Sequence, residues 1–136
     1  MKIHLYYFGK QRDTHANAMA EDYLRRISHY AKAEMSEIRT RTDPWGKYPS
    51  AYTVALDPAG KRPDSLTGMI EWAEGAARDL LFIVGGADGL TPEYRSRADF
   101  LLSLSAMTFP HELARAMLTE QIYRAFTTLR GHPYPR

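Results

Sequence analysis

The chain has 136 residues, with 18 Lys and Arg against 16 Asp and Glu, which is enough for one domain over residues 1–136 with a mildly basic charge. It has no cysteine, which excludes disulfides and thiolate zinc sites, and its five histidines show no metal-ligand spacing, so we expect no metal. No apolar run approaches the roughly 20 residues of a membrane span, and the first residues are too polar for a secretion signal, so we expect a cytoplasmic protein without membrane contact.

The first half of the chain alternates strand and helix patterns, which is typical of βα units on a mostly parallel sheet. Residues 3–8 predict a strand, 14–32 an amphipathic helix and 35–41 a weaker edge strand. The connector over 43–49 is rich in turn residues and has no helical pattern. Because a parallel crossover normally needs about a dozen residues or more, this link is marginal.

The second half continues the alternation. The apolar patterns predict strands over 52–56, 80–84 and 100–104, a helix over 65–78 capped by Asp64 or Ser65, and a short helix from Pro92. The strand over 52–56 is expected to stop at the Asp-Pro-Ala-Gly segment 57–60. Pro110 opens a long terminal helix, since proline is tolerated in a first turn.

A pocket is predicted where three loops meet. The buried-type strand 80–84 runs into the glycine turn 85–89, whose spacing fits neither a dinucleotide-binding nor a P-loop fingerprint. Loops 56–60 and 104–109 follow the neighbouring predicted strands. The carboxyl ends of parallel strands share one sheet edge, where α/β proteins bind ligands, so the three loops together favour a pocket more than the glycines alone.

Four segments, 82–90, 102–115, 118–125 and 131–136, resemble the SPOUT-class large-subunit ribosomal RNA methyltransferase H family. They read FIVGGADGL, LSLSAMTFPHELAR, LTEQIYRA and GHPYPR. The resemblance implies an α/β SPOUT fold whose mostly parallel sheet carries a C-terminal trefoil knot. It also implies an enzyme that uses S-adenosylmethionine to methylate N3 of a pseudouridine in bacterial 23S rRNA, in the assembled ribosome.

The resemblance also implies site residues. The cofactor-binding positions that carry over are Leu56, Gly85, Leu104, Ser105, Ala106, Met107, Thr108 and Phe109. The tail supplies candidates for substrate positioning in Tyr134 and Arg136, with His132 as a further candidate. Without the resemblance, a terminal Tyr or His is more often a packed or solvated chain end.

Family members are homodimers, and their subunit interface completes the active site. Here Tyr123, Phe126 and the Leu118 side of the last helix offer apolar surface for a two-fold contact. His111 and Arg115 share a helix face and either contact RNA phosphate or the other subunit, or form a first-turn surface pair. A basic face for rRNA phosphates would comprise Lys10, Arg12, Arg25, Arg26 and Arg124.

Two departures from the family pattern keep other functions open. The segment 42–51 is shorter than in the family, which usually has another helix there, and Pro135 stands where the family tail has histidine. These departures favour the alternatives of a substrate-diverged methyltransferase or a non-catalytic knotted protein that binds RNA or the ribosome.

Overall fold

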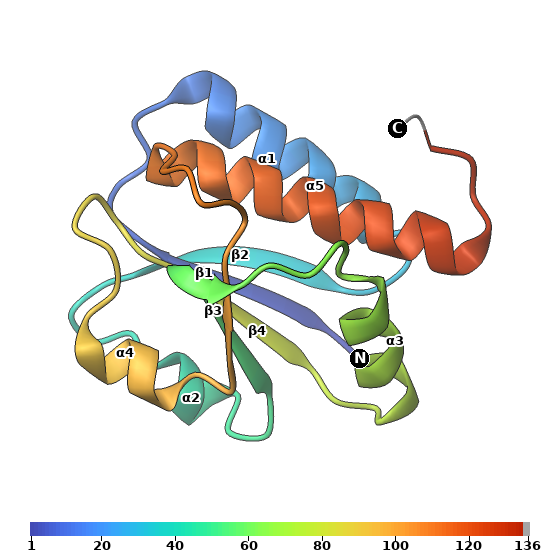
Figure 1. Ribbon diagram of the computed structural model, residues 1–136, viewed down its shortest axis with the longest axis horizontal. Coiled ribbons are helices and arrows are strands. Elements are labelled where there is room, and N and C mark those ends of the chain that lie inside the picture. The colour runs from blue at the N-terminus through green and yellow to red at the C-terminus, as the bar shows by residue number, and fades with distance from the viewer. Residues whose placement is uncertain (135–136) are drawn as a thin grey trace.

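A five-stranded sheet forms the middle layer of the protein, and the computed structural model describes residues 1–134 (Figure 1). The strands are β1 (Ile3–Phe8), β2 (Ala33–Ile38), β3 (Tyr52–Lys61), β4 (Leu80–Val84) and β5 (Phe100–Leu102). Their order is β2-β1-β4-β3-β5, and every strand pair of the described residues is parallel. The predicted α/β class with a mostly parallel sheet is therefore confirmed.

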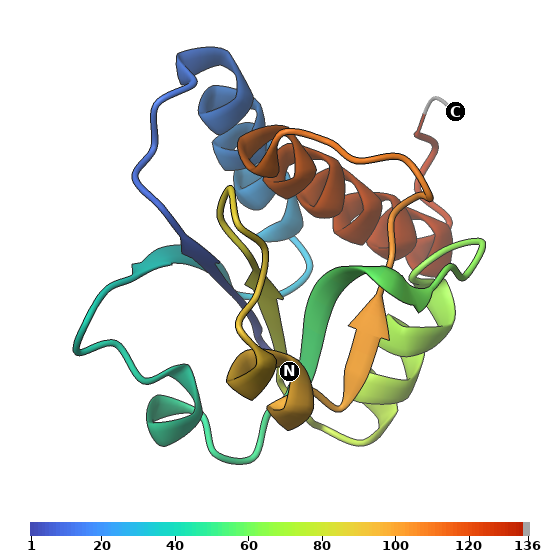
Figure 2. The same ribbon diagram turned by 60° about the vertical axis from the view of Figure 1, so that its left-hand side comes forward.

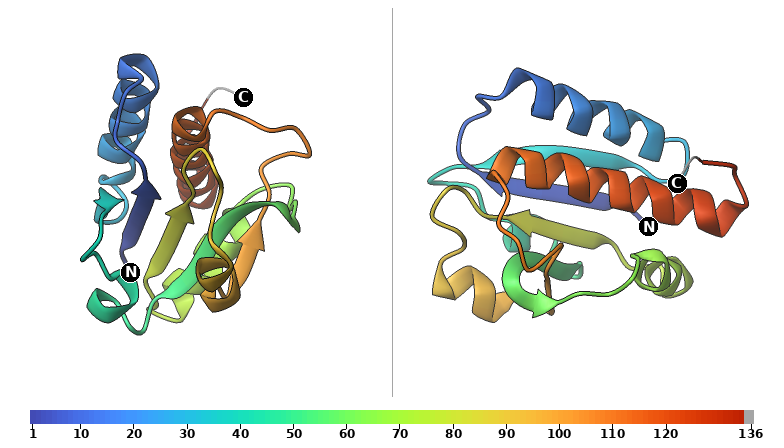
Figure 3. Two further views of the ribbon diagram at one scale, coloured as in Figure 1. Left: turned by 90° about the vertical axis from the view of Figure 1, so that its left-hand side faces the viewer. Right: turned by 45° about the horizontal axis from the view of Figure 1, so that its top comes forward.

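Helices cover both faces of the sheet. They are α1 (Thr14–Ile27), α2 (Pro44–Lys47), α3 (Thr67–Gly75), α4 (Pro92–Arg97) and α5 (His111–Arg130). The α1, α3 and α5 helices cover one face, and the short α2 and α4 helices lie on the other (Figures 2 and 3). None of the helices over residues 1–134 is both long and apolar enough to cross a membrane.

β4 is the central strand, as predicted, and it is buried along its whole length. Its side chains alternate between the two faces, as strand geometry requires. Leu80 and Phe82 join the core under α1, α3 and α5, whereas Leu81 and Ile83 join a smaller core under α2 and α4. Burial on both faces explains the unbroken apolar run in the sequence.

Two predicted boundaries near α1 are wrong. α1 ends at Ile27 rather than at residue 32, because Ser28 caps it and a tight turn follows, in which Tyr30 and Ala31 donate to the Ile27 carbonyl. β2 occupies residues 33–38 rather than 35–41. Its limits follow the pairing with β1, which aligns Ile3 with Ala33 and Phe8 with Ile38.

The connector between β2 and β3 contains α2, a single helical turn that the sequence pattern did not predict. One turn is too short to show a periodic repeat. Trp45 of α2 donates from Nε1 to Thr53 Oγ1 at 2.9 Å, which ties the connector to β3. The short link therefore still provides a parallel crossover, over the face opposite α1 and α5.

β3 continues to Lys61 instead of ending at residue 56. The expected break appears as a register shift, since β5 pairs with β3 up to Leu56 and then again at Lys61. A Cβ atom on Gly60 would lie 2.5 Å from the Leu101 carbonyl oxygen, so only glycine permits this approach of the two strands.

The neighbouring elements are shorter than predicted. α3 has Leu66 at its N-cap and spans 67–75, so the predicted cap at Asp64 or Ser65 and the range 65–78 are wrong. β5 ends at Leu102 rather than 104: the Ser103 amide makes a last hydrogen bond to the Lys61 carbonyl of β3, and the chain then leaves the sheet. The trefoil knot implied by the family resemblance stays a prediction.

Candidate active site

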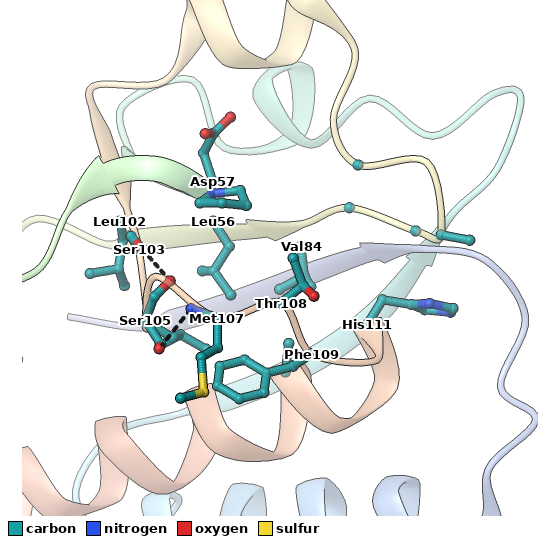
Figure 4. Close-up of a pocket in the computed structure, with 17 residues that line it drawn as sticks. Leu56, Asp57, Val84, Leu102, Ser103, Ser105, Met107, Thr108, Phe109 and His111 are labelled. Carbon is teal, nitrogen blue, oxygen red and sulfur yellow. Dashed lines mark hydrogen bonds between the residues drawn. The ribbon is translucent and has the colours of Figure 1, made fainter.

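A cavity of about 290 Å³ lies at the carboxyl ends of β4 and β5, beside the register shift of β3 (Figure 4). Its walls are residues 56–58 of β3, at the register shift, the loops that follow β4 and β5, and the first turn of α5. We call it the sheet-edge cavity. Its place confirms the pocket predicted from three converging loops, and it is where ligands bind in open α/β sheets.

Most of the predicted cofactor-binding residues line this cavity. They are Leu56, Gly85, Leu104, Ser105, Met107, Thr108 and Phe109. Ala106 lies in the same loop but is exposed and outside the wall. Three further wall residues were not among the predicted cofactor-binding positions. Asp57 lies in the predicted pocket segment 56–60, His111 was predicted to contact RNA or the other subunit, and Ser103 was missed. The structure thus brings the residues together, while their roles in binding stay a prediction.

Side-chain hydrogen bonds order the loop between β5 and α5. Ser103 donates from Oγ to the Ser105 carbonyl at 2.9 Å, and Ser105 Oγ accepts from the Met107 amide at 3.0 Å. Residues 104–109 belong to no helix or strand, and their peptide groups take no part in a helical or sheet ladder. Met107 is 74% exposed. The loop therefore offers peptide groups and a large apolar side chain to a ligand.

The glycine turn after β4 forms the opposite wall. Gly86 and Gly89 form a short antiparallel bridge, and Gly89 has a φ of +76°. A Cβ atom on Gly85 would lie 2.7 Å from the Gly89 carbonyl carbon, closer than side chains normally come. The turn thus needs glycine at Gly85 for its own closure, beyond any close approach of a ligand.

Asp57 has its charge balanced at the rim of the cavity. Its Oδ2 lies 2.5 Å from Arg95 Nε of α4, and its Oδ1 accepts from the Ala59 amide at 2.8 Å. In the view of Figure 4, its carboxylate lies beyond Leu56 from the Met107 side chain. Asp57 therefore holds α4 against β3 and is not a free base.

The start of α5 separates His111 from Arg115. His111 lines the sheet-edge cavity, whereas Arg115 is fully buried, with its guanidinium carbon 3.9 Å from the centre of the Tyr7 ring. Arg115 therefore cannot contact RNA phosphate from the surface, and both the RNA-contact and surface-pair predictions are wrong for it. Its three guanidinium nitrogens lack hydrogen-bond partners among residues 1–134, although Glu112 Oε2 lies 3.4 Å away.

Glu112, which sequence reasoning missed, connects α5 to the entry of α1. Its carboxylate accepts from the amides of Arg12 and Asp13 and from Asn17 Nδ2. Burial raises the pKa of Glu112, but the backbone hydrogen bonds from Asp13 and Arg12 outweigh burial and leave that pKa below its usual value. Glu112 is therefore ionised, and it fixes the first turn of α5 next to the cavity.

Tyr134 and His132, the predicted tail residues that the structure describes, lie apart from the sheet-edge cavity of their own chain. Tyr134 contacts Tyr23 of α1 and Glu120 of α5, and His132 is exposed. Arg136 and Pro135 lie outside the described residues. No tail residue of the described chain lines the sheet-edge cavity. Their proposed role in substrate positioning stays a prediction.

A second cavity, of about 340 Å³, lies between α1, α5 and the segment 63–66, and we call it the helix-side cavity. Its lining includes Met19 and Tyr23 of α1 and Met117 and Glu120 of α5. It shares the segment Leu102–Leu104 with the sheet-edge cavity. This segment is therefore a common wall.

Two predicted surfaces change in the structure. Leu118 and Phe126 are fully buried and Tyr123 is 7% exposed, so they belong to the core of one chain and the predicted dimer contact through them is wrong. The basic face is also reduced. Arg25 and Arg26 pair with Asp22, and Arg124 pairs with Glu120. Lys10 and Arg12 stay exposed in the loop before α1.

Solved structures share this fold. A probable methylase family protein from Haemophilus influenzae superposes with a TM-score of 0.65 at 9% identity over 98% of this chain and 72% of the other. The SpoU methyltransferase AviRb from Streptomyces viridochromogenes, solved in complex with its cofactor AdoMet, gives a TM-score of 0.56 at 11% identity over 93% and 58%. The chain thus shares the α/β fold of these methylase structures.

Sequence relatives are more specific. The family model described as "Predicted SPOUT methyltransferase" matches residues 1–135. Ribosomal RNA large subunit methyltransferase H from Solibacter usitatus is 60% identical over all of both chains, and the protein of the same name from Chromobacterium violaceum is 36% identical over 100% of this chain and 99% of its own. The chain therefore belongs to the ribosomal RNA large subunit methyltransferase H family of SPOUT methyltransferases.

The sheet-edge cavity fits the cofactor of this class. Its wall combines apolar side chains, such as Leu56 and Phe109, with the irregular backbone of residues 103–110 and a glycine turn. A nucleoside cofactor needs this combination, because its base binds apolar side chains and its polar edge binds peptide groups. Residues 1–134 contain no cluster of side chains suited to a metal ion.

Proposed function

We propose that the protein is an S-adenosylmethionine-dependent methyltransferase that modifies large-subunit ribosomal RNA. The observation that carries the proposal is the sheet-edge cavity, where residues 56–58 of β3 meet the loops after β4 and β5 in a chain of the methyltransferase H family. By analogy with the family, the acceptor is N3 of a pseudouridine in 23S rRNA of the assembled ribosome. Because bacterial ribosomes are in the cytoplasm, this substrate implies a cytoplasmic location for the protein.

In the proposed reaction, bound S-adenosylmethionine supplies an activated methyl group, and the chain aligns donor and acceptor. Leu56, Leu104 and Met107 would contact the adenine from the cavity wall. The peptide groups of residues 105–108 would bind its edge. His111, on the same wall, is available to the acceptor nucleotide.

We further propose that the active enzyme is a homodimer in which the tail of one chain serves the sheet-edge cavity of its partner. Support comes from the separation of Tyr134 from its own cavity. The apolar surface for the contact is the face around the helix-side cavity. Met19 of α1 is 49% exposed there, and Leu113, one turn before Met117 on α5, is 37% exposed.

RNA contact is proposed for the loop before α1. Lys10 and Arg12 are exposed in this loop, and a Cβ atom on its Gly9 would lie 3.7 Å from His111 Nε2. These charges therefore flank a residue of the cavity wall. Contacts of this kind position an RNA backbone more than they read its sequence.

Calorimetric titration with S-adenosylmethionine and then S-adenosylhomocysteine tests the cofactor proposal. We expect binding at about one site per chain, or one per dimer if the two sites are asymmetric. Labelled methyl transfer to ribosomes that lack the modification then tests the substrate. A folded protein that binds neither compound, with or without ribosomes, would be the non-catalytic alternative.

A further inference from the structure

Residues 131–134, which we call the tail, double back onto the protein, and polar contacts hold Tyr134 there. α5 ends at Arg130, Gly131 adopts a left-handed φ of +67°, and the chain returns so that Tyr134 reaches Glu120. The Tyr134 hydroxyl donates to Glu120 Oε2 at 2.8 Å and accepts from the Tyr23 hydroxyl at 3.1 Å. We call Tyr23, Glu120 and Tyr134 the tail clasp.

Neighbouring residues hold the clasp rigid. Arg124 lies one turn after Glu120 and pairs with its Oε2 at 2.6 Å, and the guanidinium carbon is 5.2 Å from the centre of the Tyr134 ring. The Tyr123 ring meets Tyr134 edge-on at a centroid distance of 4.9 Å. Tyr134 is thus held at both its hydroxyl and its ring.

The protonation state of Tyr134 suits a structural contact. Burial raises the pKa of the Tyr134 hydroxyl, and the hydrogen bonds with Tyr23 and Glu120 raise it further. The hydroxyl therefore stays protonated at neutral pH and donates to Glu120. A group held in this way does not remove a proton from the acceptor nucleotide.

The clasp also lies at a defined place relative to the two cavities. Tyr23 and Glu120 line the helix-side cavity and are not part of the sheet-edge wall. Between the two cavities stands the common wall of residues 102–104. The contacts that hold the tail can therefore be altered without touching the residues expected to bind the cofactor.

We propose that Tyr23 and Glu120 are positioning residues, which hold Tyr134 so that the tail meets the acceptor nucleotide already ordered. The proposal rests on the proposed function, in which the tail serves substrate positioning. An ordered tail loses less conformational freedom when the substrate binds. Loss of this order should therefore lower the rate of methyl transfer and leave the affinity for the cofactor unchanged.

Steady-state methyl transfer to unmodified ribosomes tests this role with Tyr23→Phe, Glu120→Gln and Tyr134→Phe. We expect each variant to lower kcat about tenfold, with KM for S-adenosylmethionine and calorimetric cofactor affinity unchanged within about twofold. Tyr30→Phe is the matched control. Tyr30 stacks on Phe126 of α5, the helix that carries Glu120, and is not part of the clasp. It should behave as the unsubstituted protein does.

A double-substitution cycle separates the clasp from other roles of the same groups. Because the residues act as one unit, Tyr23→Phe with Tyr134→Phe should be no slower than either single variant. If Tyr134→Phe lowers kcat but Tyr23→Phe and Glu120→Gln do not, the Tyr134 hydroxyl acts on the substrate and the positioning role is overturned. Unchanged kcat in all three variants also overturns it. If the unsubstituted protein neither binds the cofactor nor transfers methyl groups, the proposed function itself has failed.

Discussion

His4 shows how one buried residue organises charged groups at the sheet edge opposite the cavity. It is 3% exposed, its Nδ1 lies 2.9 Å from Glu34 Oε1 and its Nε2 lies 3.0 Å from Asp79 Oδ2. The Tyr48 ring stacks on it at 3.6 Å. Each ring nitrogen thus lies within hydrogen-bond distance of one carboxylate oxygen, so His4 bridges β2 and the residue before β4.

These contacts shift the pKa values of both carboxyl groups. The hydrogen bond from Tyr48 lowers the pKa of Glu34 most, burial opposes it, and His4 lowers it further. Burial raises the pKa of Asp79, but hydrogen bonds from His4 and the Lys2 amide outweigh burial and leave it below its usual value. Both carboxylates therefore stabilise the fold above their unfolded pKa values, and this stabilisation is lost as pH falls through the folded values.

We predict that acidification from about pH 6 to about pH 3 lowers the free energy of unfolding, with a shallower slope in His4→Asn. The shorter side chain cannot bridge both carboxylates, so at pH 7 we expect a loss of about 1–2 kcal/mol. Urea unfolding at a series of pH values measures both effects. His29→Asn, at an exposed histidine, is the control. Equal slopes in the two variants would remove His4 from the explanation.

At the scale of the elements, the glycine turn after β4 links backbone closure to cofactor binding. In Gly85→Ala the new Cβ atom would meet the backbone of Gly89 and Leu90 at 2.7 to 3.0 Å, so the turn must shift. We predict at least about tenfold weaker binding of S-adenosylmethionine by calorimetry. The melting temperature should change by only about 3 °C, because the buried strand ends at Val84.

Gly68→Ala provides the matched control for that prediction. A Cβ atom on Gly68 of α3 meets nothing within 4 Å. Cofactor affinity should stay unchanged, and stability should rise by about 0.5–1 kcal/mol from helix propensity. If Gly85→Ala binds the cofactor as well as Gly68→Ala does, the turn is not part of the binding site.

Some elements were predictable from the sequence because one local signal determined each of them. β1 and β4 are apolar runs buried on both faces, and the three-loop pocket follows from where such strands end. β3, in contrast, continues past Asp57 and Pro58 because β5 pairs with it again at Lys61, a contact made far along the chain. The burial of Arg115 against Tyr7 likewise depends on how α5 packs, which helical spacing alone does not reveal.

At the scale of the whole molecule, the proposed homodimer is the feature most open to test. Met19→Asp places a charge on the exposed apolar face of α1. We predict that it shifts sedimentation equilibrium from dimer to monomer and lowers methyl transfer at least about tenfold, while each folded chain keeps its melting temperature within about 3 °C.

Trp72→Asn is the control for the dimer prediction. Trp72 is 44% exposed, but it lies on α3 and packs edge-on against Tyr52, away from the helix-side cavity. This variant should stay dimeric. If Met19→Asp is also dimeric, or if the unsubstituted protein is a monomer with full activity, the proposed dimer interface around the helix-side cavity is wrong.

The strand order has a consequence for how the chain folds during synthesis. β1 lies between β2 and β4, and Ile3 pairs with Leu80, so the first strand completes its hydrogen bonds only after most of the chain has been made. Pairings of such large sequence separation form slowly and leave apolar strands uncovered meanwhile. A nascent chain that stops before Leu80 would hold at most the β1–β2 pair, without the central strand against which both cores are built.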